Sequence, residues 1–171
     1  MRKYEFTGEE RLFAGHTLRK IRALIDVADD VEAGDDGGWI EKEENLSHDG
    51  NAWVSDDAWV YGDAWVCGNA RVYGNARVYG NAWVYGDARV SGSASYLTIG
   101  PIGSRNATTT FFNTQNGQIM VVCGCFYGNI KEFEERVKLT HGESKHAQTY
   151  LAAIELAKTQ IDTASIGRER R

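Results

Sequence analysis

The chain has 171 residues, a formal net charge of −5 at pH 7 and 42% hydrophobic residues, which suits a compact domain with or without an elongated module attached. The negative charge argues against general nucleic-acid binding, which needs a basic surface to displace counterions from phosphates. The chain has three cysteines, no apolar export signal at the N-terminus and no apolar run long enough to span a membrane. We therefore expect a cytoplasmic protein that does not enter membranes.

Residues 1–49 contain no regular repeat. We expect a strand over residues 3–6 and further strands with an irregular first coil over residues 17–49, together forming an N-terminal β cap. Between residues 26 and 49 there are ten acidic residues and one base, Lys42, which we interpret as a solvated acidic face. His16 and His48 are most simply turn residues.

From residue 50 the chain repeats every six residues. Eight units follow without insertion: GNAWVS, DDAWVY, GDAWVC, GNARVY, GNARVY, GNAWVY, GDARVS and GSASYL. A period of six excludes an α-helix, because 3.6 residues per turn would scatter the valines around its surface. Each unit instead predicts a short strand with its valine inward, an alanine near the corner, and Gly-Asn or Gly-Asp at the corner, where positive φ is often needed.

Three such sides close a coil of about 18 residues, and coils stack at the strand spacing of about 4.8 Å. This repeat resembles the hexapeptide-repeat family of left-handed parallel β-helices. The preceding GGWIEKEENLSHDG, continuing into GNAWVSDDAWV, resembles the start of YdcK-type hexapeptide-repeat proteins. The whole layout also resembles hexapeptide-repeat proteins encoded by phages and prophages.

The predicted fold is mainly β. A short left-handed parallel β-helix over residues 50–97 lies between the N-terminal β cap of residues 1–49 and a small C-terminal α+β domain over residues 98–162. Residues 163–171 are expected to form a flexible tail.

Stacking by 18 residues sorts the side chains on either side of each valine onto three outward faces. These faces carry, in turn, Trp53, Ser55, Arg71, Tyr73, Arg89 and Ser91; Trp59, Tyr61, Arg77 and Tyr79; and Trp65, Cys67, Trp83 and Tyr85. Exposed Trp, Tyr and Arg are typical of interfaces. We consider three roles: stacking within the prism, packing between subunits of a homo-oligomer, which the family resemblance suggests is a trimer, and a ligand groove formed by Arg71, Arg77, Trp65 and Trp83.

After Tyr96 the repeat ends. YLTIG, ATTTFFNT and QIMVVCGCF predict three strands, with a hairpin turn at residues 115–117. Asn129 predicts the N-cap of a helix that ends at Gly142, and Ser144 begins a second helix. The buried stripe of this second helix is predicted to contain Ala147, Tyr150, Leu151, Ile154, Ala157 and Ile161.

Two polar segments in this region are candidate ligand sites. Ser104, Arg105 and Asn106 follow a glycine-rich turn and could present N–H groups and a planar cation to a phosphate or carboxylate; a plain linker between prism and cap is the alternative. Lys145 and His146 lie at a helix N-terminus, which favours anions; surface polar residues on a turn are the alternative.

We predict neither a metal site nor a bound cofactor. Cys123 and Cys125 are expected on the same side of one strand as buried apolar residues, because no further Cys or His motif completes a zinc site. Carbonic-anhydrase-like members of the family place histidines on the coils, and residues 50–97 contain none. Acyltransferase members use a histidine base, usually from a loop that interrupts the coils, and no such loop occurs here.

These observations predict an oligomeric binding protein, and not an enzyme. The first hypothesis is capture of a small anionic ligand such as a nucleotide, and the phage resemblance implies that the ligand is a host defence signal. The second is a structural module that binds itself or a host protein. The third is a hexapeptide-repeat acyltransferase, for which His48 at the edge of the prism is the candidate base.

Overall fold

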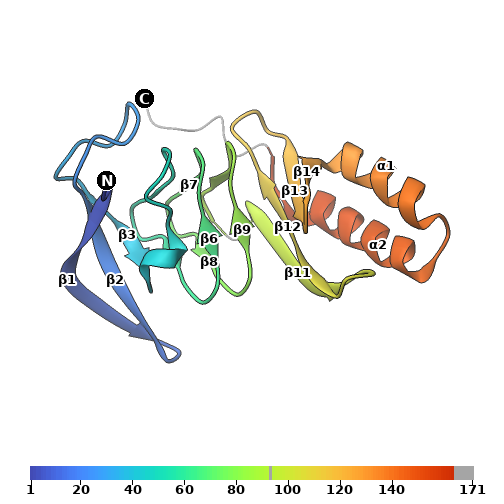
Figure 1. Ribbon diagram of the computed structural model, residues 1–171, viewed down its shortest axis with the longest axis horizontal. Helices are drawn as coiled ribbons and strands as arrows, with labels where there is room; N and C mark the ends of the chain where they lie inside the picture. The colour runs from blue at the N-terminus through green and yellow to red at the C-terminus, as the bar shows by residue number, and fades with distance from the viewer. Residues whose placement is uncertain (93, 164–171) are drawn as a thin grey trace. The chain divides into compact units, whose positions relative to one another are not determined.

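A computed structural model describes residues 1–92 and 94–163, so residues 164–171 of the predicted tail lie outside it. The chain divides into two compact units, Met1–Ser93 and Ala94–Arg171 (Figure 1). Within the described part, no helix has the length and apolar character needed to cross a bilayer.

The N-terminal unit begins with a long antiparallel hairpin of β1 (Tyr4–Phe13) and β2 (His16–Ala23). Its two-residue turn places both Ala14, with φ of 48°, and Gly15, with φ of 87°, in the left-handed region, as a turn that matches strand twist requires. β3 (Asp36–Ile40) pairs antiparallel with β2. The hairpin is much longer than the predicted strand at residues 3–6, because residues 7–11 of β1 are polar or glycine and carry no apolar alternation.

A β-solenoid follows a short 3₁₀ turn, η1 (Glu43–Asn45). Its two-residue strands recur every six residues: β4 (Trp53–Val54), β5 (Trp59–Val60), β6 (Trp65–Val66), β7 (Arg71–Val72), β8 (Arg77–Val78), β9 (Trp83–Val84) and β10 (Arg89–Val90). The valine of each strand is fully buried. The interior of the solenoid is therefore a column of valines and small alanines.

Strands 18 residues apart pair in parallel, in agreement with the predicted stacking. Arg71 pairs with both Trp53 and Arg89, and Trp65 pairs with Trp83. The backbone N–H groups of one coil donate to the carbonyl oxygens of the next coil towards the C-terminus, as Trp53 N does to Ala70 O at 2.9 Å. β3 extends one of these ladders through β5 and β8, so the hairpin and one side of the solenoid share a sheet.

The prediction that all three faces of the prism are exposed is wrong for parts of two of them. Trp53 is 2% exposed and Tyr61 is 9% exposed, whereas Tyr79 on the second face stays 52% exposed. The N-terminal segment covers the buried parts: the ring of Phe13 lies 5.0 Å from that of Trp59, and Arg71 binds Val27 O and Asp30. The error arose because residues 1–49 were interpreted as an end cap only, whereas they also lie along the sides.

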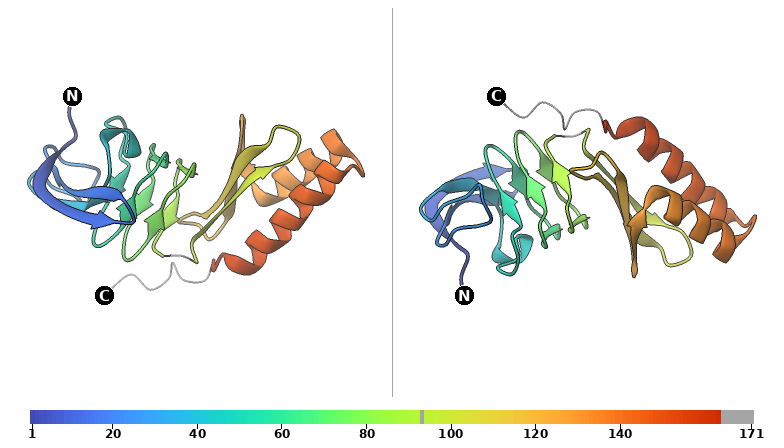
Figure 2. Two further views of the ribbon diagram at one scale, coloured as in Figure 1. Left: turned by 90° about the horizontal axis from the view of Figure 1, so that it is seen from below. Right: turned by 90° about the horizontal axis from the view of Figure 1, so that it is seen from above.

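The C-terminal unit is a four-stranded antiparallel sheet in the order β11 (Tyr96–Ile102), β12 (Ala107–Asn113), β13 (Ile119–Cys123) and β14 (Phe126–Asn129). Helices α1 (Ile130–His141) and α2 (Lys145–Gln160) cover one of its faces (Figure 2). The structure has four strands where we predicted three, because Gly124, with φ of 59°, turns the chain and divides the third predicted strand into β13 and β14. Cys125 is consequently exposed and Cys123 half-buried, which corrects the prediction of two buried thiols on one strand.

The predicted helix caps are confirmed. The Asn129 side chain accepts hydrogen bonds from Lys131 N and Glu132 N, both at 3.0 Å, and the Glu132 carboxylate accepts one from Asn129 N at 2.8 Å. Ser144 caps α2, and Gly142 ends α1. The predicted stripe of α2 packs against the sheet, where Tyr150 and Ile154 join Phe111 and Phe133 in one core.

Candidate functional site

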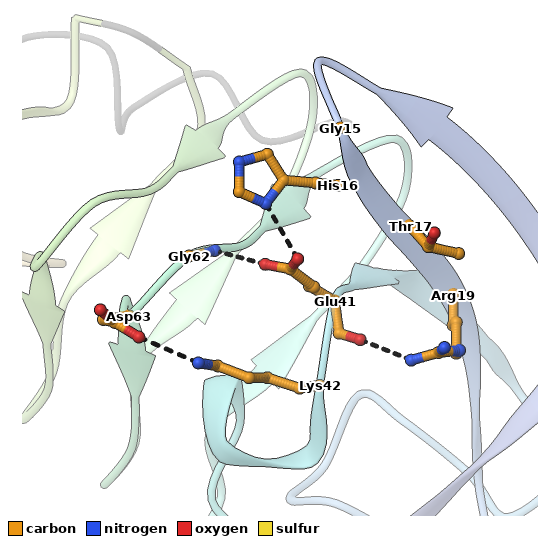
Figure 3. Close-up of a pocket in the computed structure, with 8 residues that line it drawn as sticks. All are labelled: Gly15, His16, Thr17, Arg19, Glu41, Lys42, Gly62 and Asp63. Carbon is orange, nitrogen blue, oxygen red and sulfur yellow. Dashed lines mark hydrogen bonds and ion pairs between the residues drawn. The ribbon is translucent and has the colours of Figure 1, made fainter.

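A cavity of about 610 Å³ lies in the N-terminal unit, where the β1–β2 turn, the end of β3 and a corner of the first coil meet (Figure 3). Its lining residues are two glycines, Gly15 and Gly62, and six residues with polar side chains: His16, Thr17, Arg19, Glu41, Lys42 and Asp63. Among these, His16 and Glu41 form the one pair that resembles an acid–base unit.

His16 is the first residue of β2, directly after the turn, so the turn geometry sets where its side chain emerges. Its ring lies 4.9 Å from the ring of Tyr61, which stacks on Tyr79 at 5.3 Å. Nδ1 of His16 lies 2.9 Å from Oε1 of Glu41. The stacked rings of Tyr61 and Tyr79 thus support one side of the imidazole, and the Glu41 carboxylate is hydrogen-bonded to one of its nitrogens.

Glu41 directly follows β3, and its backbone N–H donates to Val60 O at 3.0 Å, which fixes it to the solenoid. Its second carboxylate oxygen, Oε2, accepts a hydrogen bond from the backbone N–H of Gly62 at 2.7 Å. Partial burial alone would raise the pKa of Glu41, but the hydrogen bonds from His16 and Gly62 outweigh it and lower the pKa. Glu41 is therefore a fixed, ionised carboxylate at neutral pH.

An ionised carboxylate facing Nδ1 selects the imidazole tautomer that carries its proton on Nδ1. The lone pair is then on Nε2, on the side of the ring away from Glu41 (Figure 3). The His16 side chain is 36% exposed, so a small molecule in the cavity can reach it.

The remaining walls of the cavity are polar, and their side chains make contacts of their own. Arg19 donates from Nη1 to the carbonyl oxygen of Glu41 at 2.8 Å, and Lys42 forms an ion pair with Asp63 at 2.9 Å. Such walls suit a small polar molecule with several hydroxyl or amino groups. Over residues 1–92 and 94–163, no group of three or more His, Cys, Asp or Glu side chains is placed to hold a metal ion.

His48, the base considered from the sequence, is poorly placed for proton transfer. Its Nδ1 accepts a hydrogen bond from Lys3 N at 3.1 Å, and its ring stacks on Tyr4 at 4.3 Å. Nε2 is buried from solvent. Neither ring nitrogen is therefore available to a substrate, and His48 has a structural role in holding the N-terminal strand.

The structure separates the prism residues that we predicted to bind a ligand. Arg71 is held by Asp30, and the Arg77 guanidinium lies 4.3 Å above the ring of Trp59. Trp65 and Trp83 lie on another face, with their rings 5.7 Å apart and with 38% and 45% exposure. These four residues do not form a common groove.

The predicted residues of the C-terminal unit fall into two groups. Ser104 and Arg105 line a second cavity, and Asn106 is the adjoining left-handed residue, with φ of 47°. Their segment is the β11–β12 connection within this unit and not a linker between prism and cap. Lys145 and His146 are exposed on the first turn of α2 and line neither cavity.

Sequence reasoning missed the pairing of His16 with Glu41. The two residues are 25 positions apart, in segments without a repeat, and Glu41 lies in the acidic stretch that we interpreted as a solvated face. The histidine directly after an Ala-Gly hairpin turn was a usable signal, because such a turn fixes the direction of the next side chain.

Comparison with known proteins identifies the solenoid. A family model described as the YdcK Beta solenoid repeat matches residues 70–85 and 82–95. A protein of Escherichia coli (strain K12), named "Uncharacterized acetyltransferase YdcK", is 41% identical over 64 residues, which are 33% of this chain and 19% of that protein. The match thus covers about a fifth of the relative's length.

This relative contradicts our prediction that the chain is not an enzyme, since the protein that it resembles is named as an acetyltransferase. We had looked for a base only on the coils, in a loop interrupting them, or at residue 48. In this structure a histidine reaches the solenoid from the hairpin that covers its side.

Proposed function

Because the chain is a YdcK-like β-solenoid repeat protein, we propose that it transfers an acyl group from a thioester donor to a small polar acceptor, with His16 as the general base. The single observation that carries this proposal is the 2.9 Å contact between His16 Nδ1 and Glu41 Oε1, which directs Nε2 away from Glu41 and leaves it without a hydrogen-bond partner among the described residues. The name of the Escherichia coli relative supports the choice of acyl transfer among base-catalysed reactions.

In the proposed reaction, Nε2 of His16 removes the proton from a hydroxyl or amino group of the acceptor. The acceptor oxygen or nitrogen attacks the thioester carbonyl carbon and forms a tetrahedral intermediate. The carbon–sulfur bond then breaks, and the thiolate takes the proton back from Nε2. The products are the acylated acceptor and a free thiol, and His16 ends as it began. Glu41 stabilises the imidazolium between the two proton transfers.

We also propose the handedness and repeat type of the solenoid: its coils are those of a left-handed parallel β-helix of hexapeptide repeats. The six-residue strand spacing, the pairing of residues 18 apart and the positive φ at corner glycines such as Gly62 and Gly68 support this assignment.

The test is acceptor-dependent thiol release from acetyl-coenzyme A, measured with a panel of small hydroxyl and amino compounds and confirmed by the mass of the acetylated product. His16→Ala should reduce turnover at least about 100-fold, the usual contribution of a general base. A His48→Gln variant of native stability should retain turnover, because Nε2 of that residue is buried. The proposal would be rejected if no acceptor-dependent thiol release were found. It would also be rejected if His48→Gln abolished turnover while His16→Ala left it unchanged.

A further inference from the structure

The second cavity, of about 430 Å³, lies wholly within the C-terminal unit. The loop after β11, the β13–β14 turn and the two helices form its walls. The β11–β12 loop approaches α2 so closely that a Cβ atom on Gly103 would lie 1.9 Å from the hydroxyl oxygen of Tyr150. This close approach brings the loop that carries Arg105 to the edge of the cavity.

Two arginines from different elements line this cavity. Arg105 comes from the loop and Arg136 from α1, and both are exposed. Among the residues that the structure describes, neither guanidinium has a hydrogen-bond or ion-pair partner. The α1 carboxylate of Glu134 is already bound by Lys138 and Lys158. The cavity therefore presents two planar cations that pair with no carboxylate over residues 94–163.

The Tyr150 side chain adds a neutral donor to the same cavity. Burial, with the hydrogen bond from the Cys123 thiol, raises the pKa of Tyr150 to about 12. Its hydroxyl accepts this hydrogen bond from Cys123, with the two heavy atoms 3.8 Å apart. The Tyr150 proton is thus retained at neutral pH and available to an acceptor.

The lining also contains an apolar part beside the polar side chains of Ser104, Thr140 and His141. The rings of Phe126 and Phe133 lie 5.1 Å apart, and Val137 lies beside them. We propose that this cavity binds an amphipathic oxyanion, a phosphate ester or a carboxylate, whose charged group lies between Arg105 and Arg136 and whose apolar body packs on Phe126 and Phe133. Guanidinium groups bind both oxyanions bidentately. This site is independent of the acyl transfer proposed for the N-terminal unit.

Calorimetric titration of the full chain with phenyl phosphate, benzoate and inorganic phosphate tests the proposal. Phenyl phosphate or benzoate should bind at least about tenfold more tightly than inorganic phosphate, and the tighter of the two identifies the oxyanion. Arg105→Gln and Arg136→Gln should each weaken that binding at least about tenfold, as expected for loss of a charge-assisted hydrogen bond. Lys131→Gln is the matched control, because Lys131 is an exposed cation on α1 that does not line the cavity.

A second measurement locates the ligand. Cys125 is exposed and lines the cavity, whereas Cys67 belongs to the other unit. A saturating ligand should slow alkylation of Cys125 by iodoacetamide several-fold and leave Cys67 unchanged, as measured by peptide mass spectrometry. Equal binding of inorganic phosphate and the aromatic anions, no binding of either aromatic anion, or unchanged alkylation of Cys125 would each overturn the proposal.

Discussion

The side-chain amine of Lys3 donates a hydrogen bond of 2.7 Å to the carbonyl oxygen of Ala52, 49 residues further along the chain. The same amine lies 3.4 Å from the carbonyl oxygen of Gly50. One coil later, the equivalent carbonyl oxygens of Gly68 and Ala70 accept hydrogen bonds from the backbone N–H groups of Asn51 and Trp53 in the preceding coil. The first coil has no complete preceding coil, so the amine of Lys3 takes the place of the missing donors.

Asn45 does the same on another side of the first coil. Its Nδ2 donates to the carbonyl oxygens of Gly62 and Ala64 at 3.1 and 2.8 Å. Like Lys3, Asn45 is almost fully buried. Two buried polar side chains from the N-terminal segment therefore close the open end of the solenoid, where unpaired backbone groups would otherwise be costly.

Replacement of this amine should destabilise the N-terminal unit. Lys3→Met leaves the carbonyls of Gly50 and Ala52 buried without a donor, and we expect a loss of about 1–3 kcal/mol in the free energy of unfolding. All five tryptophans lie in residues 1–92, so urea denaturation followed by tryptophan fluorescence reports on this unit alone. Arg2→Met is the control, because Arg2 forms an exposed ion pair with Glu43, which contributes little. Equal stability of the two variants would contradict the capping role.

The same residue predicts a dependence of stability on pH. Burial, with a smaller contribution from the nearby Arg71 charge, lowers the pKa of Lys3 from 10.5 to about 8. Between these values the unfolded chain binds the proton and the folded chain does not. Unfolding therefore takes up a proton, and the free energy of unfolding rises with pH above 8.

We expect the wild type to gain about 1–3 kcal/mol relative to Lys3→Met between pH 8 and pH 10. Burial raises the pKa of both Tyr4 and Cys67, which acts in the opposite direction, but both groups remain in the variant and largely cancel in the difference. Urea denaturation at several pH values measures this difference in the free energy of unfolding between the wild type and Lys3→Met. A difference in stability that stays constant with pH would show that Lys3 keeps an ordinary pKa in the folded state.

Neutralisation of Glu41 should impair catalysis more than binding. Glu41→Gln removes the charge that selects the His16 tautomer and stabilises the imidazolium, so we expect kcat for acetyl transfer to fall at least about 100-fold with KM little changed. Glu44→Gln is the matched control, because Glu44 is an exposed carboxylate three residues away that does not line the cavity. An equal effect of the two substitutions on kcat would argue for a general electrostatic role of Glu41 and against a specific role through its hydrogen bond with His16.

The repeat made much of the solenoid predictable, because a period of six with a buried valine leaves few backbone solutions. The pairing of Trp65 with Trp83 followed from that period together with three sides per coil. The capping boxes of the C-terminal helices were also readable, since Asn129 and Glu132 act within one turn. Local signals of this kind depend on neighbours in the sequence.

The site was not predictable in the same way. His16 meets Glu41 only because the hairpin folds along the side of the solenoid, and no local pattern encodes that packing. The same fold-back buries Trp53, which we expected on an exposed face, and binds Arg71, which we expected to contact a ligand. Long-range packing of a segment without a repeat therefore decided both the site and the errors.

The third face of the solenoid stays a predicted subunit interface. Trp65 and Trp83 form an edge-to-face pair at 5.7 Å and remain 38% and 45% exposed, whereas Trp53 is buried and Trp59 partly buried on the other two faces. Contiguous exposed tryptophans favour association, and we predict a homotrimer that buries them. Native mass spectrometry should find three chains, and the double substitution Trp65→Ser with Trp83→Ser should give monomers of unchanged fold. A wild-type monomer at micromolar concentration would show that this face serves another partner or none.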